Sequence, residues 1–373
     1  MSEQAKFLFE DELTALKENN RFRTLNLPKG LDLTSNDYLG MAGDPSLRRS
    51  AIEALEQGLD IGAAGSRLLR GQTQSHKDLE DYAANYFNAP QTLFFPTGFQ
   101  ANYALLTTLP KRQDIIIYDQ YIHASMRDGI RASDAKSYKF AHNDVNHLEA
   151  LLKKHAIPSK TLWICVEGLY SMDGDFAPLN DIIKIIQKYN TILIVDEAHS
   201  TGIYGLKGKG LSQSIIQTIG HERLITVHTC GKAIGVAGGL ICASEPMIQT
   251  LINKARPFIY STAPMPLQAT LVQKSLEFLD TDEGENRRTQ LFDLCKQAKA
   301  LFGGSGSQIV PIIIGDDRKS LEIASQLQEK NYDIRAIRPP TVPEGTARLR
   351  LSLSSSLKKE NLESFNSALR NII

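Results

Sequence analysis

The chain has 373 residues, with 42 Lys or Arg against 42 Asp or Glu, so its formal net charge at pH 7 is zero. This balance, without a long run of like charges, argues against a broad surface for nucleic acid or for an anionic membrane, and the expected partner is a small molecule or another protein. A single core stops growing near ~250 to 300 residues, so the length predicts two domains and an arm.

The location expected from the sequence is the cytoplasm. The four cysteines show no C-x-x-C spacing and are typical of reduced thiols. The first residues lack the basic start and the apolar stretch of a secretory signal. A membrane span is not expected either, because the sequence has no stretch of about 18 apolar residues.

The predicted elements begin with an amphipathic helix. Phe9, Leu13 and Leu16 lie at positions i, i+4 and i+7, and this narrow apolar face has to pack against something else. We assign the helix to an N-terminal arm over residues 1–40, which is expected to lie on the main body.

Residues 41–280 are predicted to form a large α/β domain. Short apolar runs alternate there with longer amphipathic stretches, which favours a mainly parallel, doubly wound sheet with helices on both faces. The expected strands are Thr92–Phe95, Ile115–Tyr118, Leu162–Val166, Ile192–Val195, Leu224–Val227 and Gly239–Ala243.

Residues 281–373 are predicted to form a smaller α+β domain, because a second alternating block begins after the acidic stretch near residue 280. The expected elements are a strand over Gln308–Ile314, a helix over Lys319–Glu329, strands over Ile334–Ile337 and Arg348–Leu353, and a last helix from Lys359 to the end.

Polar residues follow the ends of five expected strands in the large domain. Doubly wound sheets bind ligands at the carboxyl ends of their strands, so these residues are expected to meet in one crevice. They are Gly98, His123, Ser171, Asp196 with His199, and Lys232.

Asp196, His199 and Lys232 indicate the class of chemistry. Asp196 closes an apolar run, and Lys232 follows 36 positions later (232 minus 196) in a loop between Gly231 and Gly235. A lysine amine can form a Schiff base with an aldehyde, and a carboxylate can keep a pyridine nitrogen protonated. This constellation predicts pyridoxal phosphate (PLP) as the cofactor.

Other residues of the crevice fit the same cofactor. Gly98 opens a helix after a strand, and free N–H groups at a helix start bind phosphate. Thr229 offers a hydroxyl for a phosphate oxygen, and His123 offers a flat ring for stacking on the pyridine. Taken alone, His123 also fits a core histidine and Lys232 a solvated loop lysine.

Asp196 also fits two other interpretations, an ATPase motif and a metal site. The run from Val195 to His199 is also the second motif of a nucleic-acid-remodelling ATPase, but neither Gly-Lys pair of the chain has the G-x-x-x-x-G-K-[ST] form that cradles phosphate. A metal site with His199 lacks a third ligand at a familiar spacing, so no metal is expected.

Arginines in the C-terminal block suit a carboxylate. Arg338 precedes two prolines, and Arg348 and Arg350 follow on an expected strand. A guanidinium fork binds a carboxylate bidentately. The alternative is a surface strand with solvated arginines.

Motifs along nearly the whole chain resemble the α-oxoamine synthases, PLP enzymes of the aspartate aminotransferase fold (fold type I). Within that family the stretch from Ala336 to Leu353 is typical of the members that act in biotin biosynthesis. The motifs are Ser35–Gly40, Gly62–Gly71, Phe140–Val145, Glu167–Gly174, Tyr260–Thr262 and Ala336–Leu353.

The resemblance implies roles for individual residues. Lys232 becomes the Schiff-base lysine, Asp196 the partner of the pyridinium, and His123 the stacking histidine that also contacts a developing oxyanion. His199 is implied to contact the phenolic oxygen of the cofactor. Further cofactor contacts implied are Gly98, Phe99, Ser171 and Thr229, with Thr262 reaching the phosphate of the other subunit in a homodimer with shared active sites.

The implied reaction is the condensation of L-alanine with a pimeloyl thioester, carried by coenzyme A or an acyl carrier protein, with release of carbon dioxide. Sister enzymes that use glycine with an acetyl thioester, or serine with a long acyl chain, share the catalytic residues and stay open as alternatives. A non-catalytic family member is expected to lack Lys232. The implied substrate contacts are Asn36, Arg338, Thr341, Arg350 and one of Arg21 and Arg23.

Overall fold

The computed structural model describes residues 3–373, with side chains described from residue 9 onward. The chain divides into two compact units. The larger unit comprises residues 37–171 and 175–290, and the smaller unit comprises the residues up to Asn36 together with 172–174 and 291–373. Residues 37–40, expected in the arm, and 281–290, expected in the small domain, thus group with the larger unit.

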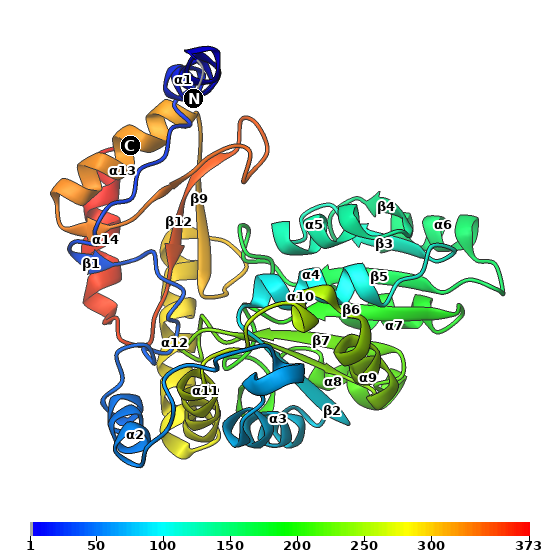
Figure 1. The fold of residues 1–373 in the computed structure, drawn as a ribbon. Helices are drawn as coiled ribbons and strands as arrows, with labels where there is room; N and C mark the ends of the chain where they lie inside the picture. Colours follow the sequence, from blue (N-terminus) through cyan, green and yellow to red (C-terminus); the bar gives the residue numbers. More distant parts are fainter. Residues whose placement is uncertain (1–2) are drawn as a thin grey trace. The chain divides into compact units, whose positions relative to one another are not determined.

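A seven-stranded sheet forms the centre of the larger unit, in the order β2-β8-β7-β6-β5-β3-β4 (Figure 1). Strands β3 to β7 pair in parallel, whereas β8 runs antiparallel to both of its neighbours. The mainly parallel α/β sheet expected from the sequence is therefore confirmed. The strands are β2 (Gln91–Phe95), β3 (Ile115–Asp119), β4 (Lys136–Phe140), β5 (Leu162–Glu167), β6 (Thr191–Asp196), β7 (Leu224–Thr229) and β8 (Gly239–Ala243).

Strand β4 was not predicted from the sequence. Its residues Lys136, Ser137 and Lys139 are polar and exposed, because β4 pairs only with β3 at the edge of the sheet. An edge strand needs no continuous apolar run, so the apolar signal that marked the other six strands is missing here.

Apolar side chains alternate between the two faces of the sheet and build one core on each face. In β3, Ile116 belongs to one core, and Ile115 and Ile117 belong to the other. This period-two pattern buries both faces and leaves the strand ends for polar groups. Helices α4 (Gly98–Thr108), α5 (Ala124–Ala132), α9 (Glu245–Lys254) and α10 (Arg256–Ile259) contribute to the first core, and α6 (Val145–His155), α7 (Leu179–Ile186) and α8 (Gln213–Ile219) to the second.

The remaining elements of the larger unit lie before β2, between β6 and α8, and after α10. They are α2 (Pro45–Glu56), the short π-helix η1 (Arg67–Gly71), α3 (Gln74–Phe87), the 3-10 turn η2 (Leu206–Gly208), α11 (Pro266–Leu279) and the first part of α12 (Asp282–Phe302), which continues into the smaller unit.

The smaller unit has the predicted α+β pattern. An antiparallel sheet in the order β11-β12-β9 accompanies a short parallel pair, β1 with β10. The single strand expected over Ile334–Ile337 is found as two short strands, β10 and β11. The elements are β1 (Leu31–Asp32), β9 (Ile309–Gly315), α13 (Asp317–Glu329), β10 (Tyr332–Asp333), β11 (Ala336–Ile337), β12 (Ala347–Ser352) and α14 (Lys359–Arg370).

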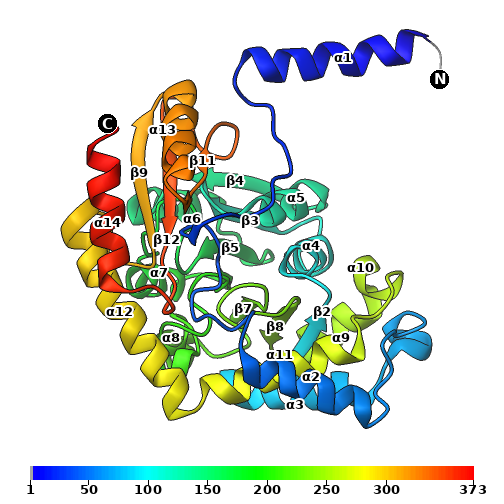
Figure 2. The same ribbon diagram turned by 90° about the vertical axis from the view of Figure 1, so that its left-hand side faces the viewer.

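Helix α1 (Glu3–Glu18) confirms the predicted N-terminal helix and is joined to β1 by an extended segment (Figure 2). Its apolar residues Phe9, Leu13 and Leu16 are 63%, 45% and 41% exposed. The residues that the structure describes therefore do not cover this apolar face. None of the helices in residues 3–373 combines the length and apolar character that a membrane span needs.

Candidate active site

Side chains from the ends of several strands line one pocket of the larger unit. Seven of them were predicted as cofactor contacts from the sequence, namely Gly98, Phe99, His123, Asp196, His199, Thr229 and Lys232. The pocket is also lined by Asn102, Ser125, Glu167, Ala198 and Val227. The pocket thus gathers the residues predicted after four of the five strand ends, and the fifth strand end contributes Glu167 in place of Ser171.

Asp196 is the last residue of β6 and is buried. Its Oδ1 accepts the backbone N–H of Ala198 at 2.9 Å, and its Oδ2 accepts the side-chain amide of Asn102 at 2.7 Å. Two N–H donors fix the orientation of this carboxyl group in the pocket. Asp196 is therefore suited to hold a protonated ring nitrogen.

Lys232 lies in a tight loop after β7 and touches His199. Its Nζ donates to Nε2 of His199 at 2.6 Å, and Nδ1 of the same ring lies 2.7 Å from Oη of Tyr38. The loop depends on Gly235, which has φ +72°, and a Cβ there would lie 2.4 Å from the backbone nitrogen of Ala42. Only glycine tolerates both conditions, so Gly235 fixes the path of the chain beside Lys232.

The start of α4 lies against the end of β7. A Cβ on Gly98 would lie 2.1 Å from Oγ1 of Thr229, so glycine is needed for this close approach. Thr97 caps the helix, because its side chain accepts the backbone N–H of Gln100 at 3.1 Å. The first N–H groups of α4 and the Thr229 hydroxyl together suit an anion such as a phosphate.

His123 is the N-cap of α5 and lies close to Ser125. Its Nδ1 accepts the backbone N–H of Ser125 at 3.2 Å, and the Ser125 hydroxyl lies 2.8 Å from the same nitrogen. Burial lowers the pKa of His123 from its ordinary value, and the charge of Lys232 lowers it further, although Asp196 opposes both. At neutral pH the ring is therefore uncharged.

Glu167 was not assigned a role from the sequence. It ends β5 and pairs in register with Asp196 at the end of β6. Burial, and next the charge of Asp196, raise the pKa of Glu167 to about 8. Its Oε2 accepts the backbone N–H of Ser171 at 3.1 Å. The available signal was its position, because Glu167 closes an apolar run in the same way that Asp196 does.

The pocket contains buried polar atoms that a ligand can satisfy. Among the residues that the structure describes, Oδ1 of Asn102 and Oε1 of Glu167 are buried without a hydrogen-bond partner. Such atoms are rare in proteins and mark places where a polar ligand or water binds. With the amine of Lys232, the carboxylate of Asp196, and the helix start at Gly98 beside the Thr229 hydroxyl, these residues fit PLP.

Two predicted cofactor contacts do not line this pocket. Ser171 is buried next to it and donates its backbone N–H to Glu167. Thr262 lines a separate small cavity with Arg67 and Phe258.

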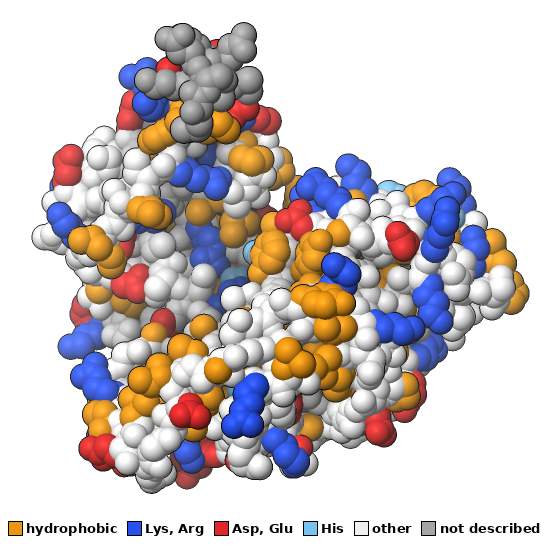
Figure 3. All heavy atoms as spheres, viewed as in Figure 1, with side chains coloured by type: hydrophobic (Ala, Val, Ile, Leu, Met, Phe, Trp, Pro, Cys, Tyr) orange, Lys and Arg blue, Asp and Glu red, His pale blue; other side chains and the backbone are white. Residues whose placement is uncertain are grey.

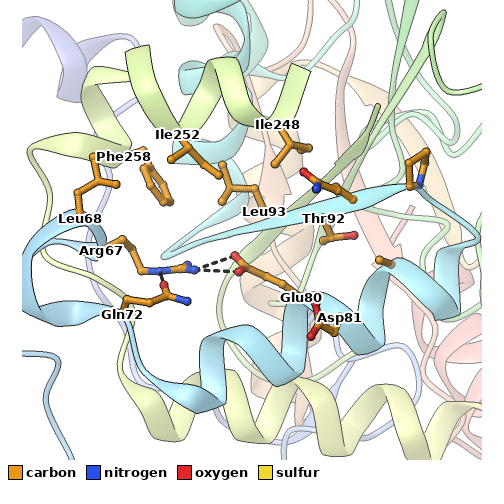
Figure 4. Close-up of a pocket in the computed structure, with 13 residues that line it drawn as sticks. Arg67, Leu68, Gln72, Glu80, Asp81, Thr92, Leu93, Ile248, Ile252 and Phe258 are labelled. Carbon is orange, nitrogen blue, oxygen red and sulfur yellow. Dashed lines mark hydrogen bonds and ion pairs between the residues drawn. The ribbon is translucent and has the colours of Figure 1, made fainter. Parts of the chain in front are cut away.

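A larger cavity, of about 440 Å³, adjoins Arg67 and is drawn in Figure 4. The Arg67 side chain points to Glu80, and the two form a buried ion pair at 2.8 Å. Arg67 also lies over the ring of Phe258, at 5.5 Å from its centre. Glu80 already neutralises Arg67, so the Arg67 guanidinium is a structural group in this larger cavity.

The predicted substrate residues lie in the smaller unit. Arg350 is buried in β12 and donates to Oγ of Ser352 at 2.7 Å. Arg23 donates to Oγ1 of Thr341 at 3.1 Å, and Arg338 donates to the backbone oxygen of Asn20.

The other two substrate candidates differ in their surroundings. Arg21 pairs with Glu344 at 2.7 Å and with Asp317 at 3.3 Å, so its charge is already balanced. Asn36 is half-buried and is the last residue of the first segment of the smaller unit.

The model of the family "Aminotransferase class I and II" matches residues 28–369. The chain belongs to this family. It is 38% identical over 371 residues to 8-amino-7-oxononanoate synthase of Chromobacterium violaceum, with 94% of each chain covered.

Solved structures agree with this assignment. Serine palmitoyltransferase from S. paucimobilis, solved with bound PLP and myriocin, has a TM-score of 0.88 at 25% identity and covers 100% of this chain and 99% of its own. 8-Amino-7-oxononanoate synthase from Francisella tularensis has a TM-score of 0.77 at 28% identity and covers 92% of this chain and 97% of its own. The chain is an α-oxoamine synthase with the PLP-dependent aminotransferase-like fold that the sequence predicted.

Proposed function

We propose that this enzyme is an 8-amino-7-oxononanoate synthase, which condenses L-alanine with a pimeloyl thioester and releases carbon dioxide. The observation that carries the proposal is the 38% identity to an enzyme of that name over 94% of both chains. The thioester is pimeloyl-coenzyme A or pimeloyl-acyl carrier protein.

The cofactor is PLP, which when bound supplies an electron sink for the carbanion formed from the amino acid. Lys232 is assigned to hold the aldehyde through its amine, and Asp196 to hold the ring nitrogen protonated. The N–H groups of Gly98 and Phe99, with the Thr229 hydroxyl, are assigned to the phosphate. His199 is assigned to the phenolic oxygen.

Lys232 is the proposed base that removes the α-proton of alanine. Its Nζ lies 2.6 Å from Nε2 of His199, which is backed by Tyr38 at 2.7 Å. These hydrogen bonds orient the Lys232 amine and place Nε2 of His199 as an acceptor for a proton from the amine. A positioned amine is what the proton transfer requires.

His123 is the proposed donor to the oxyanion that develops on the thioester carbonyl. The neutral ring accepts hydrogen bonds at Nδ1, so it carries its proton on Nε2. A fixed donor aimed at developing charge stabilises the transition state.

Arginines of the smaller unit are the proposed carboxylate ligands. Arg350, with Asn36, is assigned to the α-carboxylate of alanine. For the distal carboxylate of the pimeloyl chain we favour Arg23, with Arg338 and Thr341, over Arg21. Arg21 already pairs with two carboxylates, whereas within the described part of the chain Arg23 pairs with none.

A homodimer with shared sites is the proposed assembly. Leu69, Tyr260 and Met265 are 86%, 73% and 48% exposed, and Figure 3 shows hydrophobic side chains on the visible face of the larger unit. Exposed apolar side chains in neighbouring segments are typical of protein interfaces. The segments lie together, because Ala263 N–H donates to the Gly65 carbonyl at 2.9 Å, and they flank Thr262, which is assigned to the cofactor phosphate of the partner.

A cytoplasmic location is also proposed. All four cysteines are buried free thiols, as is usual in a reducing compartment.

A sister activity is the second candidate, because serine palmitoyltransferase structures have TM-scores of up to 0.89 with this chain. Such an enzyme would join serine to a long acyl chain, and a 2-amino-3-ketobutyrate CoA ligase would join glycine to an acetyl group. The serine palmitoyltransferase structures are 25% to 27% identical to this chain, which is lower than the 38% identity to the favoured enzyme.

Mass spectrometry of the products tests the proposal. Purified enzyme with PLP, alanine and pimeloyl-coenzyme A should yield 8-amino-7-oxononanoate and one carbon dioxide for each thioester consumed, and pimeloyl-acyl carrier protein should be tested in parallel. Failure with both donors, together with turnover of another pair of substrates, would assign the enzyme to a sister activity.

A further inference from the structure

Asn102 lies deep in the cofactor pocket and has no role in the chemistry described above. It follows Gly98 by four residues in α4 and is 2% exposed. Asparagine is a poor residue for a helix interior, because its side chain competes with the backbone for hydrogen bonds. Local structure therefore does not explain its presence.

Both amide hydrogens of Asn102 are used, and they join two functional groups. Nδ2 donates to Oδ2 of Asp196 at 2.7 Å and to Oγ of Ser125 at 3.0 Å. Since Oγ of Ser125 accepts this bond, its hydroxyl hydrogen is available to Nδ1 of His123, 2.8 Å away. One amide thus connects the partner of the ring nitrogen with the oxyanion donor.

This connection helps to decide which nitrogen of His123 carries the proton. Nδ1 accepts from the hydroxyl of Ser125 at 2.8 Å and from its backbone N–H at 3.2 Å, so the proton of the neutral ring is on Nε2. If Ser125 were released from Asn102, its hydroxyl could rotate away, and only the longer backbone bond would then hold this tautomer. Part of the rings could adopt the other tautomer, in which Nε2 has no proton to donate to the oxyanion.

The cost of this arrangement is visible on Asn102 itself. Its Oδ1 is buried, and the structure gives it no hydrogen-bond partner among the residues described. An unpaired buried acceptor is destabilising. Because both N–H groups are committed, the side chain cannot turn to satisfy its oxygen without releasing Asp196 and Ser125.

We propose that Asn102 is a positioning residue that fixes the orientation of the Asp196 carboxylate and the tautomer of His123 through a single amide group. The inference deepens the proposed function and rests on its roles for Asp196 and His123. A purely structural role, in which Asn102 only ties α4 to β6, would affect stability without affecting the state of His123.

The direct test is the ¹⁵N spectrum of His123 in histidine-labelled enzyme with PLP bound. Asn102→Ala and Ser125→Ala should both move the two ring nitrogens from the pattern of a single tautomer to that of a mixture. Asn143→Ala is the matched control, since its amide also donates to a carboxylate, that of Asp175 at 2.8 Å, away from the pocket lining. Unchanged His123 shifts in either the Asn102 or the Ser125 variant would overturn the proposal.

Measurements of PLP affinity and of kcat distinguish the effect of the Asn102–Asp196 hydrogen bond from that of the Asn102–Ser125 hydrogen bond. Only Asn102→Ala frees Asp196, so it should weaken PLP binding more than Ser125→Ala does. Both should lower kcat by tenfold or more, on the order of what misplaced catalytic groups cost. An Asn102→Ala enzyme with the kcat of the Asn143→Ala control would overturn the proposal. The ¹⁵N spectrum is recorded without substrate. It therefore tests the role of Asn102 even if the enzyme proves not to use alanine and a pimeloyl thioester.

Discussion

At the scale of single residues, the proposed chemistry depends on the amine of Lys232. Lys232→Ala should abolish turnover while the fold survives, because the residue is in a loop and its amine is assigned both to anchor the cofactor and to transfer the proton. Borohydride reduction of wild type followed by peptide mapping should place the cofactor on Lys232. A label on any other lysine would contradict the assignment.

The raised pKa of Glu167 predicts how the free energy of unfolding changes with pH. Its folded-state pKa of about 8 lies above the ordinary 4.5, because it is buried next to Asp196 and only partly compensated by Lys232, with Asp119 adding further negative charge. The folded state therefore binds this proton more tightly than the unfolded state. The contribution is fully present below pH 4.5 and is lost as the pH rises through about 8.

Glu167→Gln should remove this dependence, because an amide does not titrate. Denaturant unfolding of both PLP-loaded proteins between pH 5 and 8 measures it, and the free energy of unfolding should fall more steeply with pH in wild type. Parallel slopes would mean that Glu167 is ionised across that range in the folded enzyme.

The arginines carry the prediction on substrate binding. Arg350→Lys replaces a fork by a point charge and should raise the alanine KM about tenfold or more, equivalent to ~1.4 kcal/mol. Arg23→Ala should raise the KM of the thioester and spare alanine. Arg21→Ala is the matched control for Arg23, because its ion pairs with Glu344 and Asp317 give it a structural role. If Arg23→Ala and Arg21→Ala raised the KM of the thioester equally, the preference for Arg23 over Arg21 would be wrong.

At the scale of elements, the approach of α4 to β7 depends on Gly98. Gly98→Ala would put a Cβ 2.1 Å from Oγ1 of Thr229, so either the helix start or the Thr229 hydroxyl must move and the two donors no longer meet at one point. PLP affinity should fall by about tenfold or more, as a displacement near 1 Å can cost. Gly43→Ala is the control, since a Cβ there meets nothing within 4 Å. Equal PLP dissociation constants for the two variants would contradict the phosphate role of this helix start.

The elements also show why part of the site was predictable from sequence. A buried parallel strand is a continuous apolar run, so its end is visible in the sequence, and Asp196 was found in this way. Asn102 was missed because a polar residue inside a helix gives no sign of whether it faces a pocket. Thr262 follows no strand end, so only the family resemblance suggested a role for it.

At the scale of the whole molecule, the sequence predicted two folding patterns and the structure contains both. The α/β pattern is in the larger unit, which carries the residues assigned to PLP, and the α+β pattern is in the smaller unit, which carries the arginines proposed for carboxylates. The grouping of residues 281–290 with the larger unit could not be predicted, because α12 is one continuous helix that crosses the division.

The central claim is that this enzyme joins alanine to a pimeloyl group, and a competition assay tests it most directly. The PLP-loaded enzyme is given alanine, glycine and serine together with equal amounts of pimeloyl-, acetyl- and palmitoyl-coenzyme A. The initial products are identified and quantified by mass spectrometry. The expected main product is 8-amino-7-oxononanoate. A main product from glycine and the acetyl thioester, or from serine and the palmitoyl thioester, would contradict it.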